Sequence, residues 1–207
     1  MQRTRRRVLQ AGAALSIGTL AGCLSSPNSG SETTLDPPMV GNEDAPVLVE
    51  SYEDFTCKYC RLFHLEIFPQ LFSEYVETGA VQFKRRDYPF LDPEWSWKAA
   101  SAARAVQDQQ DDATFFEYAS RLYQNFDQYD LEMFATQADS VGADPEAVRS
   151  AVRNERYLST LEAEKESGNE RNVSKTPTVF VNGSRPESPR YVHLKAAIES
   201  ELESSGD

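Results

Sequence analysis

Phe55-Thr56-Cys57-Lys58-Tyr59-Cys60 is the stretch that decides the fold, because its two cysteines stand where a strand-like run meets a helix-like one. The preceding residues 45–52 (APVLVESY) are short and β-rich, and from Leu62 onward apolar residues return at helical spacing. Both thiols are therefore predicted at a helix N-terminus. Unpaired N–H groups and the helix dipole favour an anion there, so the first thiol should ionise more readily than a free cysteine.

This cysteine pair is predicted to carry out thiol–disulfide exchange. A thiolate is the nucleophile of that chemistry, and a second thiol three residues later can eject a bound partner. An inert disulfide is the structural alternative, but Cys57 and Cys60 are too close in sequence to staple a fold. A zinc site is disfavoured, because it needs four ligands and the chain adds only His64 and His193 to the two thiols.

The N-terminus resembles an export signal followed by a lipid attachment site. Residues 4–9 (TRRRVL) resemble a twin-arginine signal, and the apolar run 8–21 is too short to span a bilayer but suits a signal peptide. Residues 20–23 (LAGC) resemble a lipobox, which predicts cleavage before Cys23 and lipid on its thiol. We therefore expect export and anchoring to the outer face of the cytoplasmic membrane. A soluble signal peptide with a chance cysteine, or a true membrane span, is the alternative.

The charge balance is strongly acidic, with a formal net charge of −12. The first 22 residues hold four arginines and no acids, so the mature chain would carry −16. Such acidity argues against nucleic-acid or anionic-membrane contact through charge. It resembles the surfaces of proteins from salt-loving archaea, where screening is very short-ranged. A moderately acidic bacterial protein is the alternative.

The element pattern predicts an α/β domain interrupted by helices. A flexible Ser/Thr/Pro/Gly-rich tether (residues 23–38) follows the signal (residues 1–22), and the domain has a first part (39–92), a helical insertion (93–170) and a second part (171–207). The expected elements, in order, are a strand at 47–52, a helix from the cysteines to about 77 with a kink at Pro69, a strand at 80–88, helices at 95–109, 112–125, 130–141 and 144–165, a strand at 178–181 and a helix at 190–203.

Four local matches give this order a family resemblance. They are residues 41–47 (GNEDAPV), 54–60 (DFTCKYC), 83–89 (FKRRDYP) and 176–183 (TPTVFVNG). On these, the chain from Met39 to its end resembles the DsbA-like branch of the thioredoxin superfamily. The resemblance implies a thioredoxin fold with a helical insertion between the second and third predicted strands. It also implies an exported protein-disulfide oxidoreductase, here of a haloarchaeal lipoprotein type.

The resemblance assigns roles to the cysteine segment. Cys57 would be the attacking thiol and Cys60, one helical turn further in, the more shielded resolving thiol. Lys58 and Tyr59 between them would tune the site, with Lys58 placing a cation beside Cys57.

Thr176 and Pro177 are the predicted substrate-binding residues. Pro177 matches the family's cis-proline, which lies beside the cysteines and exposes the backbone of Thr176 for edge-to-edge pairing with an extended substrate peptide. A trans proline opening a strand is the alternative. The family commonly has glycine two residues before this proline, where the chain has Lys175; this lysine would add positive charge to the groove or would simply be solvated.

The chain departs from the family at the buried acid beneath the thiols. The family often places that acid six residues before the first cysteine, where Ser51 stands here. Glu50 should face the other side of the strand because of strand alternation. Proton transfer is therefore expected to be weaker, to be mediated by water, or to use Glu53 or Asp54.

Several aromatic and histidine side chains allow two interpretations. His64, one turn after Cys60, would tune the thiols or serve as a surface or packing residue. The aromatics of the insertion would line a hydrophobic substrate groove or form core; they are Trp95, Trp97, Phe115, Phe116, Tyr118 and Tyr123.

The sequence therefore predicts an enzyme that exchanges the Cys57–Cys60 disulfide with cysteines of exported client proteins. Lys58, the helix N-terminus and the lack of an acid at Ser51 favour a stable reduced form, and this predicts an oxidase rather than a reductase. We expect a monomer with no metal and no cofactor beyond this disulfide, reset by an unidentified membrane redox partner. The rival prediction is a non-catalytic, peptide-binding lipoprotein of the same fold.

Overall fold

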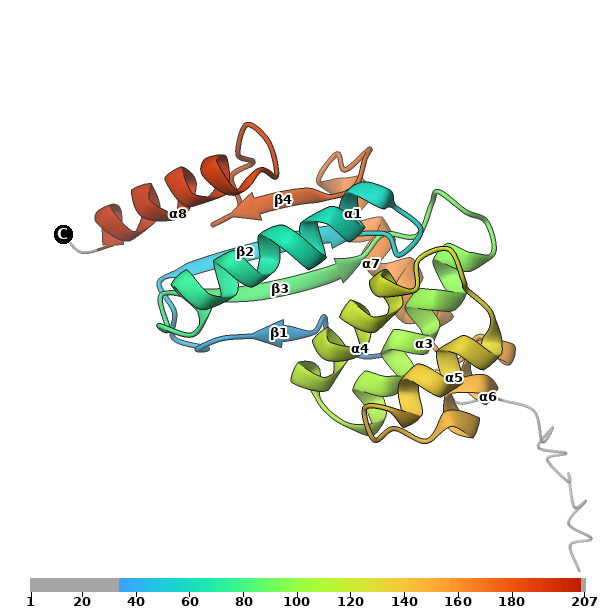
Figure 1. The fold of residues 1–207 in the computed structure, drawn as a ribbon. Helices are drawn as coiled ribbons and strands as arrows, with labels where there is room; N and C mark the ends of the chain where they lie inside the picture. Colours follow the sequence, from blue (N-terminus) through green and yellow to red (C-terminus); the bar gives the residue numbers. More distant parts are fainter. Residues whose placement is uncertain (1–33, 206–207) are drawn as a thin grey trace, which may run out of the picture.

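The computed structural model describes residues 34–205, so the predicted signal and Cys23 lie outside the described residues (Figure 1). Its elements, in chain order, are β1 (Met39–Val40), β2 (Val47–Glu53), α1 (Lys58–Leu62), η1 (Phe63–Ile67), α2 (Phe68–Leu71), η2 (Phe72–Val76), β3 (Val81–Asp87), α3 (Trp95–Gln109), α4 (Asp112–Gln124), α5 (Leu131–Asp139), α6 (Pro145–Arg153), α7 (Leu158–Glu170), β4 (Thr178–Val181) and α8 (Tyr191–Ser205). No helix within residues 34–205 is long and apolar enough to cross a membrane.

A four-stranded sheet with the order β1-β3-β2-β4 forms the centre of the molecule. The central strands β2 and β3 are parallel, with Val47 opposite Val81 and Glu53 opposite Asp87. The outer strands β1 and β4 run antiparallel to β3 and β2. All but one residue of β2 are buried, as expected of a central strand covered on both faces.

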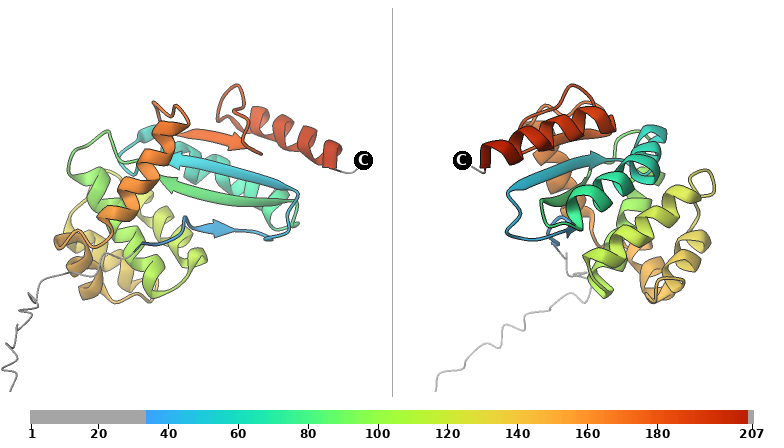
Figure 2. Two further views of the ribbon diagram at one scale, coloured as in Figure 1. Left: turned by 180° about the vertical axis from the view of Figure 1, so that it is seen from behind. Right: turned by 60° about the vertical axis from the view of Figure 1, so that its left-hand side comes forward.

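Helices cover both faces of this sheet. The helical run α1–η2 lies on one face, where α2 also contacts α8 (Figure 1). Helix α7 crosses the opposite face (Figure 2), where Gly168 lies so close to Tyr88 and Tyr52 that a Cβ atom would approach the Tyr88 ring to 2.7 Å. A glycine is therefore required for α7 to rest on the sheet. Beneath this helix, Tyr52, Tyr88, Val173 and Phe180 form a second, smaller core.

The helical run after the cysteines is continuous but irregular. It alternates α-helical and π-helical segments from Lys58 to Val76. Pro69 lies in the first turn of α2, directly after a π-helical segment, because it has no N–H to continue the preceding ladder. The predicted disturbance at Pro69 therefore takes the form of π-helical segments on both sides of α2.

The helical insertion, which lies between β3 and β4 in the sequence, packs beside the sheet. Its other helices surround α3. Helix α3 is rich in buried alanines and small enough in cross-section to contact α4, α5, α6 and α7. The expected α/β architecture with an insertion between the second and third predicted strands is thereby confirmed. The predicted helix 95–109 and strand 178–181 match α3 and β4 residue for residue.

Two elements differ from the prediction. The single helix expected over 144–165 is wrong: α6 ends at Arg153 and α7 begins at Leu158, with Glu155 between them at φ 51°. This left-handed residue lets the chain turn so that α7 can reach β3, but no glycine or proline marks the turn. Strand β1 was missed because its two residues are too few to show alternation; it pairs Met39 with Lys84 and Val40 with Phe83.

Candidate active site

The two cysteines begin α1, as predicted from the sequence. Cys57 is the N-cap residue, and its Sγ accepts a hydrogen bond from the main-chain N–H of Cys60 at 3.4 Å. Cys57 is 3% exposed and Cys60 is completely buried. Both are free thiols in this structure. The helix N-terminus thus presents a donor directly to the first sulfur.

The buried carboxylate of Asp54 holds this loop in place. It accepts hydrogen bonds from the N–H and hydroxyl of Thr56 at 2.8 and 2.9 Å and from the Ser96 hydroxyl at 3.0 Å. It also accepts the N–H groups of Phe90 and Leu91, at 2.9 and 3.0 Å. One side chain therefore joins the cysteine loop, the segment after β3 and the first turn of α3. Because these donors occupy both oxygens, Asp54 serves as an anchor of the loop.

The proline loop lies directly against Cys57. The peptide bond between Thr176 and Pro177 is cis, as expected. The Cys57 thiol donates to the carbonyl oxygen of Thr176 at 3.3 Å, across 119 positions of sequence. The predicted catalytic and substrate-binding residues are therefore brought together. Lys175 is exposed, and its carbonyl accepts the Thr178 hydroxyl.

Hydrogen bonds to its sulfur lower the pKa of the Cys57 thiol to about 6. The Cys60 side chain contributes most and the main-chain N–H groups of Cys60 and Tyr59 add to it, while burial acts in the opposite direction. For Cys60, burial raises the pKa well above the ordinary value, and the bond to Cys57 and the charge of Glu53 add to this. The site therefore favours a Cys57 thiolate beside a neutral Cys60 thiol.

Lys58 and Tyr59 are the two residues between the cysteines. The Lys58 ammonium lies 5.0 Å from the centroid of the Tyr59 ring, and both side chains are exposed. The main-chain N–H of Tyr59 is among the groups that lower the pKa of Cys57, and the Cys60 side chain contributes most.

Glu53 supplies the buried carboxylate that the position of Ser51 lacks. It lies two residues further on the same strand face, and the Ser51 hydroxyl donates to its Oε1 at 2.7 Å. The Tyr123 hydroxyl donates to Oε2 at 3.1 Å, and Arg85 Nε lies 3.5 Å from the same oxygen. Burial alone would raise the pKa of Glu53, but chiefly the Arg85 charge, with His64 and Ser51, lowers it to about 2. Glu53 is therefore a fixed negative charge near Cys60.

Glu50 lies on the opposite face, as strand alternation predicted. Its carboxylate pairs with Arg171 at 2.8 Å and with Arg86 at 3.2 Å. It belongs to the surface beneath α7 rather than to the thiol site.

His64 is a buried packing residue that also contacts the acid. It is 1% exposed and lies against the rings of Phe68, Phe116 and Tyr123. Its Nε2 is 3.0 Å from the Ser120 hydroxyl and its Nδ1 is 3.7 Å from Glu53 Oε2. His64 therefore helps to lower the pKa of Glu53.

Sequence reasoning missed Arg85, the buried cation that holds Glu53 ionised. Arg85 is completely buried in β3, between Glu53 and Asp87, and its guanidinium lies 4.2 Å from the centroid of the Phe55 ring. The sequence did contain a pattern that indicates a buried Arg85, because Val81, Phe83 and Arg85 alternate on one face of the predicted strand. No cluster of three or more His, Cys, Asp or Glu side chains within residues 34–205 could hold a metal ion.

The geometry defines a class: a thioredoxin-like fold with a dithiol at the N-terminus of a helix, facing a cis-proline loop. Comparison with known proteins gives the family, because the profile described as Thioredoxin matches residues 33–200 and the chain belongs to that family. Disulfide bond formation protein D of Bacillus subtilis is 27% identical, covering 84% of this chain and 81% of the relative.

Solved structures agree with this assignment. Oxidised BdbD from Bacillus subtilis superposes with a TM-score of 0.76 at 26% identity, covering 81% of this chain and 93% of the other. DsbA of Chlamydia trachomatis gives the same TM-score at 21% identity, covering 88% and 98%. The expected thioredoxin fold and the DsbA-like resemblance are both confirmed.

Replacing Glu53 by Gln should lower the pKa of Cys60, because the charge of Glu53 raises it. Thiolate absorbance against pH, measured in a Cys57→Ser background, reports this pKa. Glu50→Gln is the matched control, since it removes a carboxylate from the other face of the same strand. Equal Cys60 titrations in the two variants would contradict the assignment.

The same variant should change acid stability. A carboxyl whose pKa falls from 4.5 to about 2 on folding stabilises the protein above pH 4.5, and this contribution is lost as the pH falls toward 2. It amounts to about 3 kcal/mol. Chemical denaturation across this pH window should show that Glu53→Gln loses this part of the pH dependence.

Proposed function

We propose that this protein is a protein-disulfide oxidoreductase that oxidises cysteine pairs of exported client proteins. The observation that carries the proposal is the opposed tuning of two adjacent thiols, with the pKa of Cys57 lowered to about 6 and that of Cys60 raised. A thiol with a low pKa is both a ready nucleophile and a good leaving group.

The reaction begins from the Cys57–Cys60 disulfide. A client thiolate attacks Cys57 Sγ, forming a mixed disulfide and releasing Cys60, which takes up a proton. A second client thiolate then attacks the client sulfur, releasing the Cys57 thiolate and leaving the client with a disulfide. Two electrons have passed from the client to the enzyme, and a membrane-bound oxidant must remove them to reset it.

The direction of exchange is supported by the stability of the reduced form. Hydrogen bonds from the Cys60 side chain and from the main-chain N–H groups of the helix N-terminus favour the Cys57 thiolate, which exists only after reduction. Stabilising the reduced form makes the disulfide a stronger oxidant. The name of the Bacillus subtilis relative, disulfide bond formation protein D, agrees with this direction.

Cys60→Ser should accumulate mixed disulfides with client proteins, because Cys57 still attacks a client disulfide and no neighbouring thiol releases the complex. Cys57→Ser should trap almost none. Non-reducing electrophoresis of both variants, with insulin as a model client, measures the difference. Equal trapping would reverse the roles, and a wild-type protein that exchanges with neither insulin nor glutathione would favour the peptide-binding alternative.

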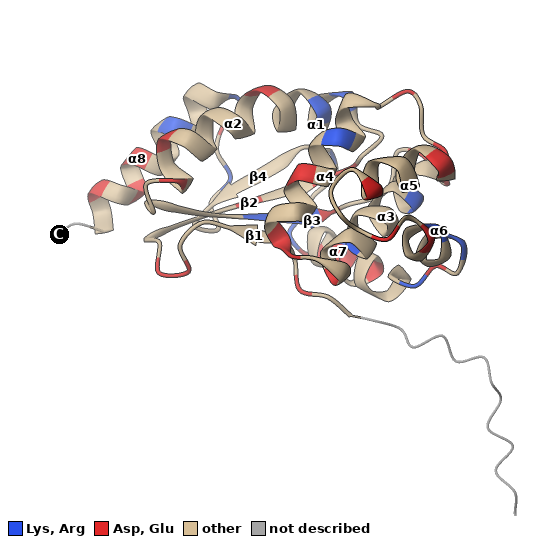
Figure 3. Ribbon diagram, turned by 60° about the horizontal axis from the view of Figure 1, so that its bottom comes forward, with Lys and Arg blue, Asp and Glu red and all other residues tan. Residues whose placement is uncertain are grey.

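We also propose that the chain is exported through its twin-arginine signal and anchored by lipid on Cys23. The LAGC sequence and the Ser/Pro-rich tether support anchoring. The acidic side chains spread over several helices (Figure 3) and the net charge of −12 support adaptation to high salt.

Mass spectrometry of the membrane fraction should find a mature chain that begins at lipid-modified Cys23. Cys23→Ala should release the protein from the membrane. An intact N-terminus in the mature protein, or equal membrane association of wild type and variant, would contradict the anchor.

A further inference from the structure

Two short stretches of the chain match the acceptor motif for N-linked glycosylation, which is Asn-x-Ser with any residue but proline in the middle. They are residues 172–174 (NVS) and 182–184 (NGS). In an exported protein this motif marks a surface asparagine that can carry a glycan. Because the motif is short enough to occur by chance, the surroundings of each asparagine must show whether its amide is free to react. The two copies differ in this respect.

The amide of Asn182 is engaged in holding the fold together. Its Oδ1 accepts the main-chain N–H of Leu48 in β2 at 2.8 Å. Its Nδ2 donates to Glu201 Oε2 of α8 at 2.8 Å and to the carbonyl oxygen of Pro46 at 3.4 Å. The nitrogen that would bond to a sugar already makes two hydrogen bonds. Asn182 is therefore a structural residue of the turn after β4 and a poor acceptor.

The side chains of Asn172 and Ser174, in contrast, are free. Both residues are exposed, whereas Val173 between them is 4% exposed. Within residues 34–205, neither the Asn172 nor the Ser174 side chain makes a hydrogen bond. Val173 packs in the smaller core beneath α7, and its carbonyl oxygen accepts the Tyr88 hydroxyl at 2.8 Å. The buried valine thus fixes the middle of the motif and leaves its two reactive side chains at the surface.

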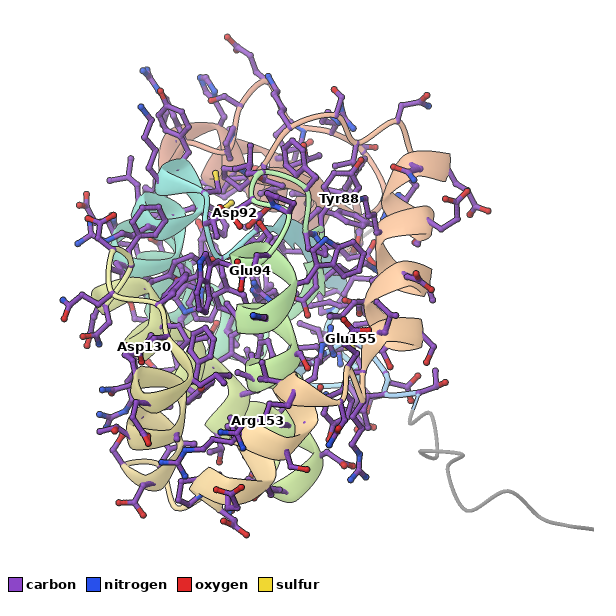
Figure 4. The ribbon with its side chains drawn as sticks, turned by 90° about the vertical axis from the view of Figure 1, so that its right-hand side faces the viewer. Tyr88, Asp92, Glu94, Asp130, Arg153 and Glu155 are labelled. Carbon is purple, nitrogen blue, oxygen red and sulfur yellow. The ribbon has the colours of Figure 1, made fainter. Side chains whose placement is uncertain are left out.

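This motif follows directly after α7, on a side of the molecule that Figure 4 shows. There α7 runs from the link at Glu155 to the neighbourhood of Tyr88. The main-chain N–H of Asn172 donates to the Asn169 carbonyl at 2.9 Å, and Arg185 Nη2 donates to the Asn172 carbonyl at 3.2 Å. The main chain of Asn172 is therefore held in place by two bonds, while its amide side chain stays available.

The end of α7 explains only part of this arrangement. Asn172 has φ 57°, and the N–H of Val173 bonds back to the Gly168 carbonyl at 2.9 Å. Glycine is the usual residue with positive φ at such a helix end, and asparagine is found there less often. The helix end requires nothing of position 174. The combination of a free asparagine amide with a free serine hydroxyl two residues later therefore has no cause in the fold.

We propose that Asn172 carries an N-linked glycan. The proposal goes beyond the redox function and rests on the proposed export, because the glycan donor is met on the outer face of the membrane. Asn172 Nδ2 forms a bond to the anomeric carbon of an oligosaccharide that is carried on a lipid phosphate. The bond from this carbon to the phosphate oxygen breaks, the lipid phosphate leaves with the electron pair, and the amide loses one proton. A membrane-bound glycosyltransferase catalyses the transfer and recognises the Ser174 hydroxyl.

Mass spectrometry of the mature protein, isolated from the membrane fraction of its native cells, tests the proposal. The wild-type peptide that contains Asn172 should carry a glycan, and the peptide that contains Asn182 should carry none. Ser174→Ala should abolish the modification, although it leaves Asn172 and its φ angle in place. Asn172→Asp should abolish it as well. Ser184→Ala, which breaks the other motif, is the matched control and should keep the glycan on Asn172.

Exchange with glutathione should be the same in wild type and Ser174→Ala, which shows that the variant is folded. A wild-type chain that begins at lipid-modified Cys23 and has no glycan on Asn172 would overturn the proposal and leave export intact. A glycan on Asn182 in place of Asn172, or one that Ser174→Ala retains, would also overturn it. A wild-type chain that keeps its whole N-terminus and has no glycan would contradict the proposed export and this proposal together.

Discussion

The buried negative charge of Glu53 is the constraint on which the rest of the structure depends. A charge removed from water must be paired, and its partner must be paired in turn. Glu53 contacts Arg85, Arg85 contacts Asp87, and Asp87 contacts Arg104 of α3, with nitrogen–oxygen distances of 3.5, 2.5 and 2.8 Å. Arg104 in turn reaches Glu164 of α7. This series of ion pairs fixes the insertion against the sheet and the sheet against the thiols.

The same charge contributes to the chemical difference between the two cysteines. Burial raises the pKa of Cys60, and the hydrogen bond to Cys57 and the charge of Glu53 add to this, so that the Cys60 sulfur stays neutral and can donate a hydrogen bond to Cys57. Cys57 is held at the helix terminus by a loop that Asp54 ties to the segment after β3 and to Ser96. Thiolate stability at Cys57 thus follows chiefly from fixed hydrogen bonds.

Local sequence signals predicted most of the fold and the reacting residues. The C-x-x-C at a strand–helix junction located Cys57 and Cys60 through their spacing and the start of a helix, and the family resemblance of the Thr-Pro-Thr motif located Pro177. The alanine-rich pattern of α3 was equally clear. The break at Glu155 left no such signal, since only the docking of α7 on the sheet requires it.

The supporting charges were harder to predict for a related reason. That Glu53 replaces the acid missing at Ser51 depends on Arg85, a residue 32 positions away that becomes adjacent only when β2 and β3 pair. Interactions between charged side chains can be predicted only once the tertiary structure is known, whereas helix capping can be predicted from the sequence.

The account is tested most directly by titrating the Cys57 thiol in the reduced protein. Ultraviolet thiolate absorbance and the rate of alkylation, followed against pH in wild type with Cys57→Ser as reference, isolate this group. The structure predicts an inflection near pH 6 that disappears in Cys57→Ser. An inflection near the value of a free cysteine, about 8.5, would contradict it.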